Sequence, residues 1–228
     1  MGNNQKSAGV RNEPSLPSEL TLVEDLAALR RICDDGAFSL EGLHLRGLTL
    51  TPDALAGMDF DGVLLEWCTL TESAWNKAAF LNTVFRDCEC SGGNFSGSWF
   101  TRCVFERCKG VGANFTETRL RDVLLRGCRF RYANFTSSQL DCCTAEDTDL
   151  SEAFFAECKL TACRMRDATL TRAEFFRTPL RGLDLRACNI DGICVSTEGR
   201  ELAGAVVTYD QAASLARLLG VEIRDSIN

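Results

Sequence analysis

The most regular feature of this sequence is a large apolar residue at every fifth position. The series runs from Leu40 to Val195 and covers 32 positions, of which only Cys90, Gly110 and Ala145 are not large and apolar. An α-helix repeats every 3.6 residues and a β-strand every two, so neither accounts for a strict period of five. The pattern predicts a repeat architecture in which each five-residue unit adds one large side chain to a continuous core.

A second series, of mostly small residues, stands two positions before each large residue. Residues two apart in an extended segment point to the same face, so each unit sends one small and one large side chain inward and then turns a corner. The corner pairs are rich in glycine and charge, as in Arg46-Gly47 and Asp61-Gly62. Nine of the 13 cysteines belong to the small series: Cys68, Cys88, Cys103, Cys108, Cys128, Cys143, Cys158, Cys163 and Cys188.

A longer period of 20 residues is superimposed on the period of five. It relates five phenylalanines: Phe95, Phe115, Phe135, Phe155 and Phe175. Four units then make one turn of a square coil, and about eight coils stacked about 4.8 Å apart give a rod on the order of 38 Å long. Gly110 and Ala145 each remove a large side chain from the core, so we expect a narrowing or a cavity there, filled in part by a neighbour.

The repeat resembles the pentapeptide-repeat family, whose unit is Ala-(Asp/Asn)-Leu/Phe-X-X. The clearest matches are Ala113-Asn114-Phe115-Thr116-Glu117 and Ala133-Asn134-Phe135-Thr136-Ser137. The resemblance covers residues 38–197. It implies an all-β solenoid, a right-handed quadrilateral β-helix, with a capping helix at each end. Such a resemblance is specific for the fold and says little about function, because one fold supports many functions.

The two ends of the chain depart from the repeat. Residues 1–37 are expected to form a flexible N-terminus and a capping helix near 22–33, because Thr21 and Glu24 have capping-box spacing. Residues 51–57 keep the phase, but their Thr, Pro and Gly favour a helical turn. Residues 198–228 are expected to form a C-terminal cap and dimerisation segment, in which Thr208 and Gln211 give a second capping box.

The ending from Val206 to Val221 is similar to the tail of the fluoroquinolone-resistance and topoisomerase-protection members of the family. In those members the C-terminal element makes a head-to-head dimer, and the rod is proposed to imitate B-form DNA. The resemblance implies a homodimer and makes DNA gyrase or topoisomerase IV the candidate partner. The predicted dimer residues are Leu215, Leu218, Leu219, Val221 and Ile223.

Composition and charge exclude several classes of function. No apolar run approaches the roughly 20 residues of a membrane-spanning helix, and the first 20 residues lack a signal-peptide core. An odd number of cysteines without a leader indicates a reducing compartment, so we expect a cytoplasmic protein. The net charge of −7 argues against direct nucleic-acid binding.

Catalysis and metal binding are equally poorly supported. The single histidine, His44, has no Cys, Ser or carboxylate at a catalytic motif spacing. We interpret the cysteine series as small packing residues rather than as a soft-metal site, and the pair Cys142-Cys143 as packing plus an exposed thiol. We therefore expect no enzymatic activity, no metal and no cofactor.

Two outward-facing groups are candidate partner surfaces. The first is an apolar stripe made of Leu64, Val84, Val104 and Leu124. A contiguous apolar patch on the surface indicates a partner or a covering segment, whereas β-propensity on a flat sheet is the alternative interpretation. The second is an acidic patch made of Asp141, Glu146, Asp147, Asp149, Glu152 and Glu157. The alternative interpretation of this patch is a solvated face with salt bridges between coils, such as Arg126 to Glu146 and Arg121 to Asp141.

Charge tests the idea of DNA mimicry. A duplex of the same length carries about 22 negative charges, whereas residues 38–195 hold 21 acidic and 18 basic residues, a net of −3. Mimicry along the whole rod is therefore not supported. The strict phase from 60 to 195 also leaves no room for the extra loops of the drug-protecting relatives. Two functions stay open: a topoisomerase interactor, or a protein-interaction scaffold or secreted effector unrelated to topoisomerases.

Overall fold

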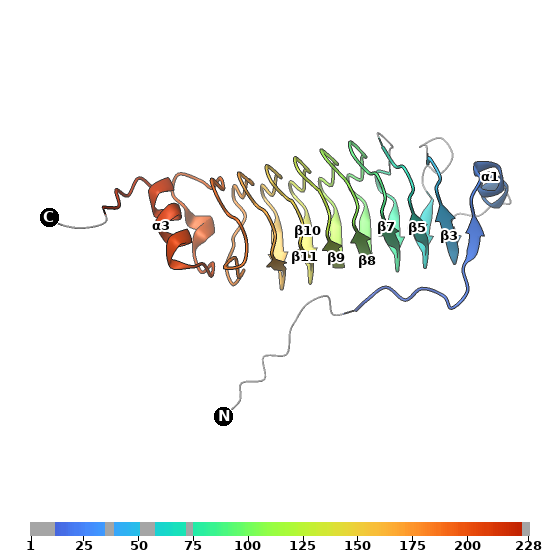
Figure 1. The fold of residues 1–228 in the computed structure, drawn as a ribbon, viewed down its shortest axis with the longest axis horizontal. Coiled ribbons are helices and arrows are strands. Elements are labelled where there is room, and N and C mark those ends of the chain that lie inside the picture. Colours follow the sequence, from blue (N-terminus) through green and yellow to red (C-terminus); the bar gives the residue numbers. More distant parts are fainter. Residues whose placement is uncertain (1–11, 35–38, 51–57, 72–74, 225–228) are drawn as a thin grey trace, which may run out of the picture.

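The computed structural model describes residues 12–34, 39–50, 58–71 and 75–224. The chain winds into an elongated parallel β-solenoid, with helix α1 at one end and helix α3 at the other (Figure 1). Within these residues, no helix has both the length and the apolar character needed to cross a membrane.

The strands stack in two columns along the rod, and every pairing is parallel. The column on face 1 consists of β2 (Ser39–Glu41), β4 (Asp59–Asp61), β6 (Ala79–Leu81), the first halves of β8 (Trp99–Glu106) and β9 (Arg119–Arg126), β10 (Gln139–Asp141) and β12 (Lys159–Thr161). The column on face 2 consists of β1 (Thr21–Val23), β3 (Leu43–Arg46), β5 (Leu64–Glu66), β7 (Val84–Arg86), the second halves of β8 and β9, β11 (Thr144–Glu146) and β13 (Arg164–Arg166). From β2 onward, paired residues differ by 20 in number, which confirms the period of 20.

The other two sides of the coil are held by single bridges instead of strands. Face 3 is bridged through positions such as Thr69, Glu89 and Lys109, and face 4 through Asn94 and Asn114, again at intervals of 20. The four-sided β-helix predicted from the sequence is therefore confirmed. About seven turns carry strands, and the last turn before the C-terminal cap is built from bridges and hydrogen-bonded corners.

The corners fall two residues after each large apolar residue, where φ is positive. Glycine takes this left-handed conformation without steric cost, as at Gly47 and Gly62. Many corners carry other residues, including Lys77 and Tyr132, with φ of 64° and 59°. Backbone hydrogen bonds to the next coil, such as Lys77 N to the Ser96 carbonyl at 3.0 Å, fix these corners and offset the strain.

The interior is a set of stacked aromatic rings. Phe80 lies on Phe100 with ring centroids 4.7 Å apart, and Phe85 lies on Phe105 at 4.3 Å. A separate stack on face 4 follows the phenylalanines of the 20-residue period, with ring separations of 4.9 to 5.1 Å. Each ring is buried only by neighbouring coils, so the stability of the rod accumulates along the stack.

Gly110 and Ala145, which stand where the period of five would place a large apolar residue, have different surroundings. Gly110 leaves no cavity, because the Phe130 ring of the next coil occupies the space where a Cβ would stand. Beside Ala145 a cavity of about 30 Å³ remains, lined by apolar side chains that include Leu125, Leu150 and Met165. The expected filling by a neighbour is thus complete at the first position and incomplete at the second.

The N-terminal cap differs from the prediction. Residues Thr21–Val23 form strand β1, which pairs in parallel with β3, and the helix is α1, Leu26–Asp34. The predicted capping box of Thr21 and Glu24 is wrong: the Asp25 carboxylate accepts from the Ala28 amide at 2.7 Å and caps the helix. The β-branched and apolar residues at 21–23 continue the open edge of face 2, which a helix at that position would leave unpaired.

The C-terminal cap follows the prediction more closely. Thr208 and Gln211 form the capping box of α3, Tyr209–Leu218, and a 3₁₀ turn, η1 (Arg200–Leu202), precedes it. Leu215 is buried against the last coils, whereas Ala212, three residues earlier in the helix, is exposed. The helical turn predicted at 51–57 lies outside the described residues.

Candidate partner-binding surfaces

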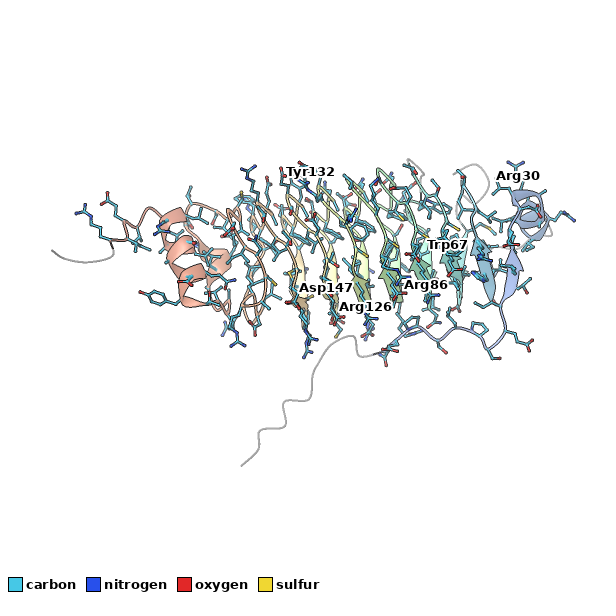
Figure 2. All side chains as sticks on the ribbon, viewed as in Figure 1. Arg30, Trp67, Arg86, Arg126, Tyr132 and Asp147 are labelled. Atoms are coloured by element: carbon cyan, nitrogen blue, oxygen red, sulfur yellow. The ribbon has the colours of Figure 1, made fainter. Side chains whose placement is uncertain are left out.

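Face 2 carries a ladder of alternating charge. The residue after each large side chain is, in turn, Arg46, Glu66, Arg86, Glu106, Arg126, Glu146 and Arg166. Arg86 lies between two carboxylates, 3.0 Å from Glu106 and 3.5 Å from Glu66. Figure 2 labels Arg86 and Arg126 on this side of the rod. Opposite charges on adjacent parallel strands stabilise the register and leave this line of the surface close to neutral.

The predicted acidic patch is a belt around the rod. Its six residues come from one turn, but Asp141 is on face 1, Glu146 on face 2, Asp149 on face 3 and Glu157 at the corner after face 4. Five of the six carboxylates form ion pairs with arginines of neighbouring coils. The two predicted salt bridges are confirmed, with Arg126 to Glu146 at 3.2 Å and Arg121 to Asp141 at 3.7 Å.

Asp147 is the exception in this belt. It occupies a corner with φ of 47°, and among the described residues no cation lies within ion-pair distance of its carboxylate (Figure 2). Glu152, also at a corner, shares Arg131 with Asp149. The belt is therefore mostly neutralised, with one carboxylate available to a partner. A role for the whole group in partner binding stays a prediction.

The predicted apolar stripe is less accessible than its outward position implies. Leu64, Val84 and Leu124 are only 8%, 7% and 8% exposed, and Val104 is half-buried. Residues 12–20 run along the neighbouring corner of the rod, from Gly42 to Asp122. The arm lies beside the stripe, and a role for the stripe in partner binding stays a prediction.

Sequence reasoning missed this N-terminal arm, which was expected to be flexible. Asn12 donates to Asp122 at 3.2 Å, the Ser15 amide donates to Asn82 at 3.4 Å, and Pro17 packs against Gly62. Two signals were available in the sequence. The corner positions 42 and 62 are both glycine, which leaves room for a chain, and Pro14 and Pro17 favour an extended segment.

His44 has a partner that its sequence spacing does not reveal. Its Nε2 lies 3.2 Å from a Glu66 carboxylate oxygen, one coil away, within the face 2 ladder. Both residues form part of the coil-to-coil contacts, and no nucleophile joins them within the described residues.

The cysteines are mainly packing residues with hydrogen-bonded thiols. Cys68, Cys88, Cys108 and Cys128 each donate to a carbonyl oxygen of the preceding coil, at 3.2 to 3.4 Å. Burial raises the pKa of Cys103 to about 12 and that of Cys158 to about 11, so these thiols are poor nucleophiles at neutral pH. No group of metal ligands occurs among the described residues.

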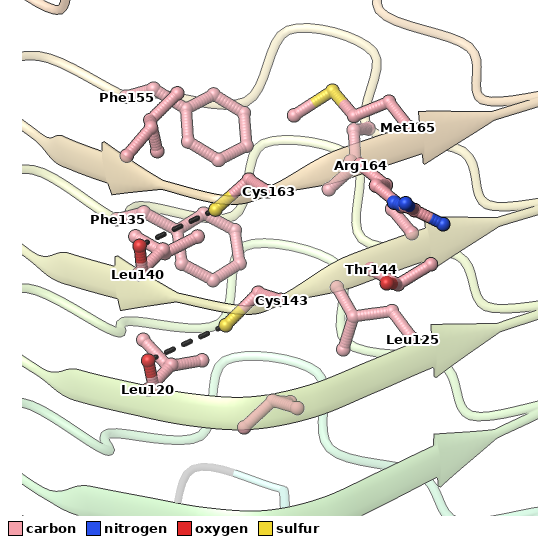
Figure 3. A pocket seen from close by; sticks show the side chains of 14 residues that line it. Leu120, Leu125, Phe135, Leu140, Cys143, Thr144, Phe155, Cys163, Arg164 and Met165 are labelled. Atoms are coloured by element: carbon pink, nitrogen blue, oxygen red, sulfur yellow. Dashed lines mark hydrogen bonds between the residues drawn. The ribbon is translucent and has the colours of Figure 1, made fainter. Parts of the chain in front are cut away.

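Two features modify this picture. Cys142 and Cys143 are both buried, so the exposed thiol predicted for this pair is wrong; the exposed cysteine is Cys194. Cys143 and Cys163 line the cavity beside Ala145 and donate to the Leu120 and Leu140 carbonyls (Figure 3). Burial raises the pKa of the Cys143 thiol well above its usual value.

The C-terminal segment carries large apolar side chains at the end of the rod. Of the predicted dimer residues, Leu215 is buried in the cap and is not available to a second copy. Leu219 packs against Gly199 and is 44% exposed. Leu218, Val221 and Ile223 are also exposed. Their role in a dimer stays a prediction.

Two comparisons with solved structures give fold-level likenesses. A trypsin-treated form of QnrB1, a plasmid-mediated fluoroquinolone resistance protein, is 19% identical with a TM-score of 0.42, over 80% of this chain and 98% of that one. HetL, a pentapeptide repeat protein involved in heterocyst differentiation regulation in the cyanobacterium Nostoc sp. strain PCC 7120, is 15% identical with a TM-score of 0.41, over 81% and 97%. No curated protein matches the sequence.

Family models match most of the coil. The model described as pentapeptide repeat region matches residues 85–155, and the model described as pentapeptide repeats matches residues 59–102 and 155–192. Together they cover residues 59–192 without a gap, which is more than half of the 228 residues. The chain belongs to the pentapeptide-repeat family.

Proposed function

We propose that this protein acts without catalysis, as a rigid rod that binds a protein partner. The proposal rests on the arrangement of the charged side chains on the surface of the rod. On face 2 and around the acidic belt, most of the charged groups are paired with neighbouring coils, and the interior is filled with stacked rings. What the rod offers to another molecule is a fixed shape with side chains repeated about every 4.8 Å.

We further propose DNA gyrase or topoisomerase IV as the partner. Support comes from the C-terminal sequence, which resembles the topoisomerase-protection members of the family. The charge distribution limits how such a partner would be bound. Because five of six belt carboxylates are paired, the belt presents no DNA-like run of free negative charge, and Asp147 is the belt residue best placed to meet a basic cleft.

A supercoiling assay with purified gyrase, with and without a fluoroquinolone, tests the partner. We expect the protein at micromolar concentration to inhibit supercoiling or to relieve inhibition by the drug. Asp147→Lys should weaken the effect about tenfold, because a repulsive charge at an interface costs about 1.4 kcal/mol or more. Asp191→Lys is the control, since Asp191 is exposed and lies outside the belt, next to the corner at Gly192.

The alternative is a scaffold for a protein unrelated to topoisomerases. It would be favoured if wild-type protein neither binds gyrase or topoisomerase IV nor changes their activity. The non-catalytic proposal itself would be contradicted by a turnover activity that is lost when His44 or a single cysteine is replaced.

A further inference from the structure

The N-terminal arm, residues 12–20, runs along the corner between faces 1 and 2, a path that we term the corner channel. It contacts the rod at Gly42, Gly62, Asn82 and Asp122, which are corner positions spaced by multiples of 20 residues. The arm therefore runs along the axis of the rod and crosses the strands, with its N-terminal end directed toward the C-terminal coils (Figure 1).

The spacing of the arm matches the spacing of the coils. A polyproline-type chain rises about 3.1 Å per residue, so three residues advance about 9.3 Å, close to the about 9.6 Å of two coils. From Ser15 to Asn12 the arm moves three residues, and its partner on the rod changes from Asn82 to Asp122, two coils further on. The two hydrogen-bonded residues of the arm are thus spaced to match two coils of the rod.

The rod is shaped to receive this chain. A Cβ built on Gly62 would lie 2.9 Å from Pro17 Cδ, so only glycine admits the proline ring at this depth. Further along, the Asp122 side chain is buried and accepts from the Asn12 amide. Prolines suit an arm that crosses the strands, because such a chain has no ladder in which its N–H groups would pair.

The arm is held by few bonds. Its contacts include the two hydrogen bonds to Asn82 and Asp122 and the packing of Pro17 on Gly62, and within the arm only Pro14, Leu16 and Leu20 are half-buried. The channel runs beside the apolar stripe on face 2. An arm with so few contacts can be exchanged for another segment of the same chemistry.

We propose that this corner channel is a binding site for an extended, proline-containing peptide of the pattern Asn-x-Pro-x-x-Pro, and that the protein's own arm occupies it in cis. A partner that presents such a segment must displace the arm before it binds. The proposal goes beyond the function proposed above, because it requires no topoisomerase.

The first test uses a fluorescent synthetic peptide with the sequence of residues 12–20 and full-length protein. Wild-type protein should bind it weakly, because the tethered arm competes at a high effective concentration. Asn12→Asp with Pro17→Ala weakens the arm, since a carboxylate then faces Asp122 and the proline contact is lost. This variant should bind the peptide at least about tenfold more tightly than wild type, as measured by anisotropy.

Matched variants of the channel make the test specific. Gly62→Ala, added to the weakened-arm protein, should abolish peptide binding. Gly47→Ala should not, because Gly47 has a similar φ but nothing within 4 Å of an added Cβ. Failure of the weakened-arm protein to bind the peptide, or equal binding by the two glycine variants, would overturn the proposal.

A second test follows the arm in cis and does not depend on peptide affinity. Glutamyl endopeptidase cleaves after Glu19 only when the arm leaves the channel far enough to enter the protease. In otherwise wild-type protein, Gly62→Ala should raise the rate of this cleavage about tenfold, whereas Gly47→Ala should leave it near the wild-type rate. Equal rates in both variants would mean that the arm does not occupy the channel in solution.

Discussion

The Gln211 side-chain amide donates to the carbonyl oxygen of Leu185 at 2.9 Å, so a residue of helix α3 closes the last turn of the rod. The same nitrogen donates to the Cys188 carbonyl at 2.9 Å, and Gln211 Oε1 accepts from the Thr208 amide at 2.8 Å. One side chain thereby satisfies carbonyls at the open edge of the solenoid and an amide at the start of the helix.

Replacing Gln211 with Glu separates these two roles. The carboxylate still accepts from Thr208 but cannot donate, and it meets two carbonyl oxygens without a proton to share. We expect the free energy of unfolding to fall by about 1–3 kcal/mol, measured by urea denaturation, with the helix start intact. Gln139→Glu, at an exposed position in mid-rod, is the control. An unchanged stability in Gln211→Glu would mean that water replaces the donor at no cost.

Glu201 closes the same end through its carboxylate, and this makes the cap sensitive to acid. It accepts from the Arg177 amide at 2.9 Å and from the Ser196 hydroxyl at 2.8 Å. Burial disfavours the charged form, but these hydrogen bonds outweigh it and hold the pKa of Glu201 below its usual value.

A carboxyl group whose pKa is lowered by folding stabilises the protein above its unfolded pKa, about 4.3 for Glu, and loses that contribution as pH falls through the folded value. Glu201→Gln should therefore lower the free energy of unfolding by about 1–2 kcal/mol at pH 7. The difference from wild type should shrink below about pH 4. Urea denaturation at several pH values measures both. A difference that stays constant across this range would show that the charge of Glu201 is not the stabilising feature.

The alternating ladder on face 2 predicts a charge-reversal effect. Arg86→Glu places three carboxylates in line with Glu66 and Glu106, and we expect a loss of about 1–2 kcal/mol that is larger at low salt. Arg86→Met keeps much of the packing of the arginine stem but adds no third carboxylate, so it should lose less stability and show a weaker salt dependence. Thermal unfolding at two salt concentrations tests this. Equal losses in Arg86→Glu and Arg86→Met would show that packing of the side chains, rather than charge order, matters here.

Two glycines in the same turn separate steric overlap from backbone strain. An added Cβ at Gly110 would overlap the ring of Phe130, whereas at Gly112, with φ of +66°, it would meet nothing within 4 Å. Gly110→Ala should cost about 1–3 kcal/mol or more through displacement of the ring, and Gly112→Ala about 1 kcal/mol through strain alone. Denaturant unfolding of both variants ranks them. A smaller effect at Gly110 would mean that the aromatic stack shifts freely.

The core of this fold could be predicted because its signal is strictly periodic. The large side chains from Phe60 to Ile190 point into the core and are mostly buried, so their positions can be predicted from the period of five alone. The ends could not be predicted as well, because each cap occurs only once in the chain and is not part of the repeat. Residues 21–23 pair as a strand through backbone groups, and backbone pairing does not change the apolar pattern of the sequence. The arm at 12–20 is held by Asn12, Ser15 and Pro17, whose partners are 67 to 110 residues away for the two hydrogen bonds.

The surface was harder to predict than the core, because residues that share a surface can be far apart in the sequence. The stripe of Leu64, Val84, Val104 and Leu124 is correctly placed on one side, but the arm beside it is remote in sequence. The six acidic residues are close in sequence, yet a coil of 20 residues distributes them over all four faces. Nearness in the sequence of a solenoid indicates a shared turn, while a shared face requires a separation of 20.

The last prediction concerns association through the C-terminus. Leu218 and Val221 are 49% and 51% exposed, and no described residue covers them, whereas Leu215 is used by the cap. Exposed apolar groups at the end of a rod favour an isologous contact between two copies. Light scattering at micromolar concentrations should therefore give twice the chain mass of 25.1 kDa.

Leu218→Glu with Val221→Glu should return the mass to that of a single chain without loss of the fold, because neither residue is part of the core cluster. Trp99→Glu, which charges an exposed apolar residue in mid-rod, should leave the dimer intact. Burying two charged carboxylates in an apolar contact costs several kcal/mol, enough to separate the copies at these concentrations. A wild-type protein that scatters as a single chain would show that residues 198–224 only cap the solenoid.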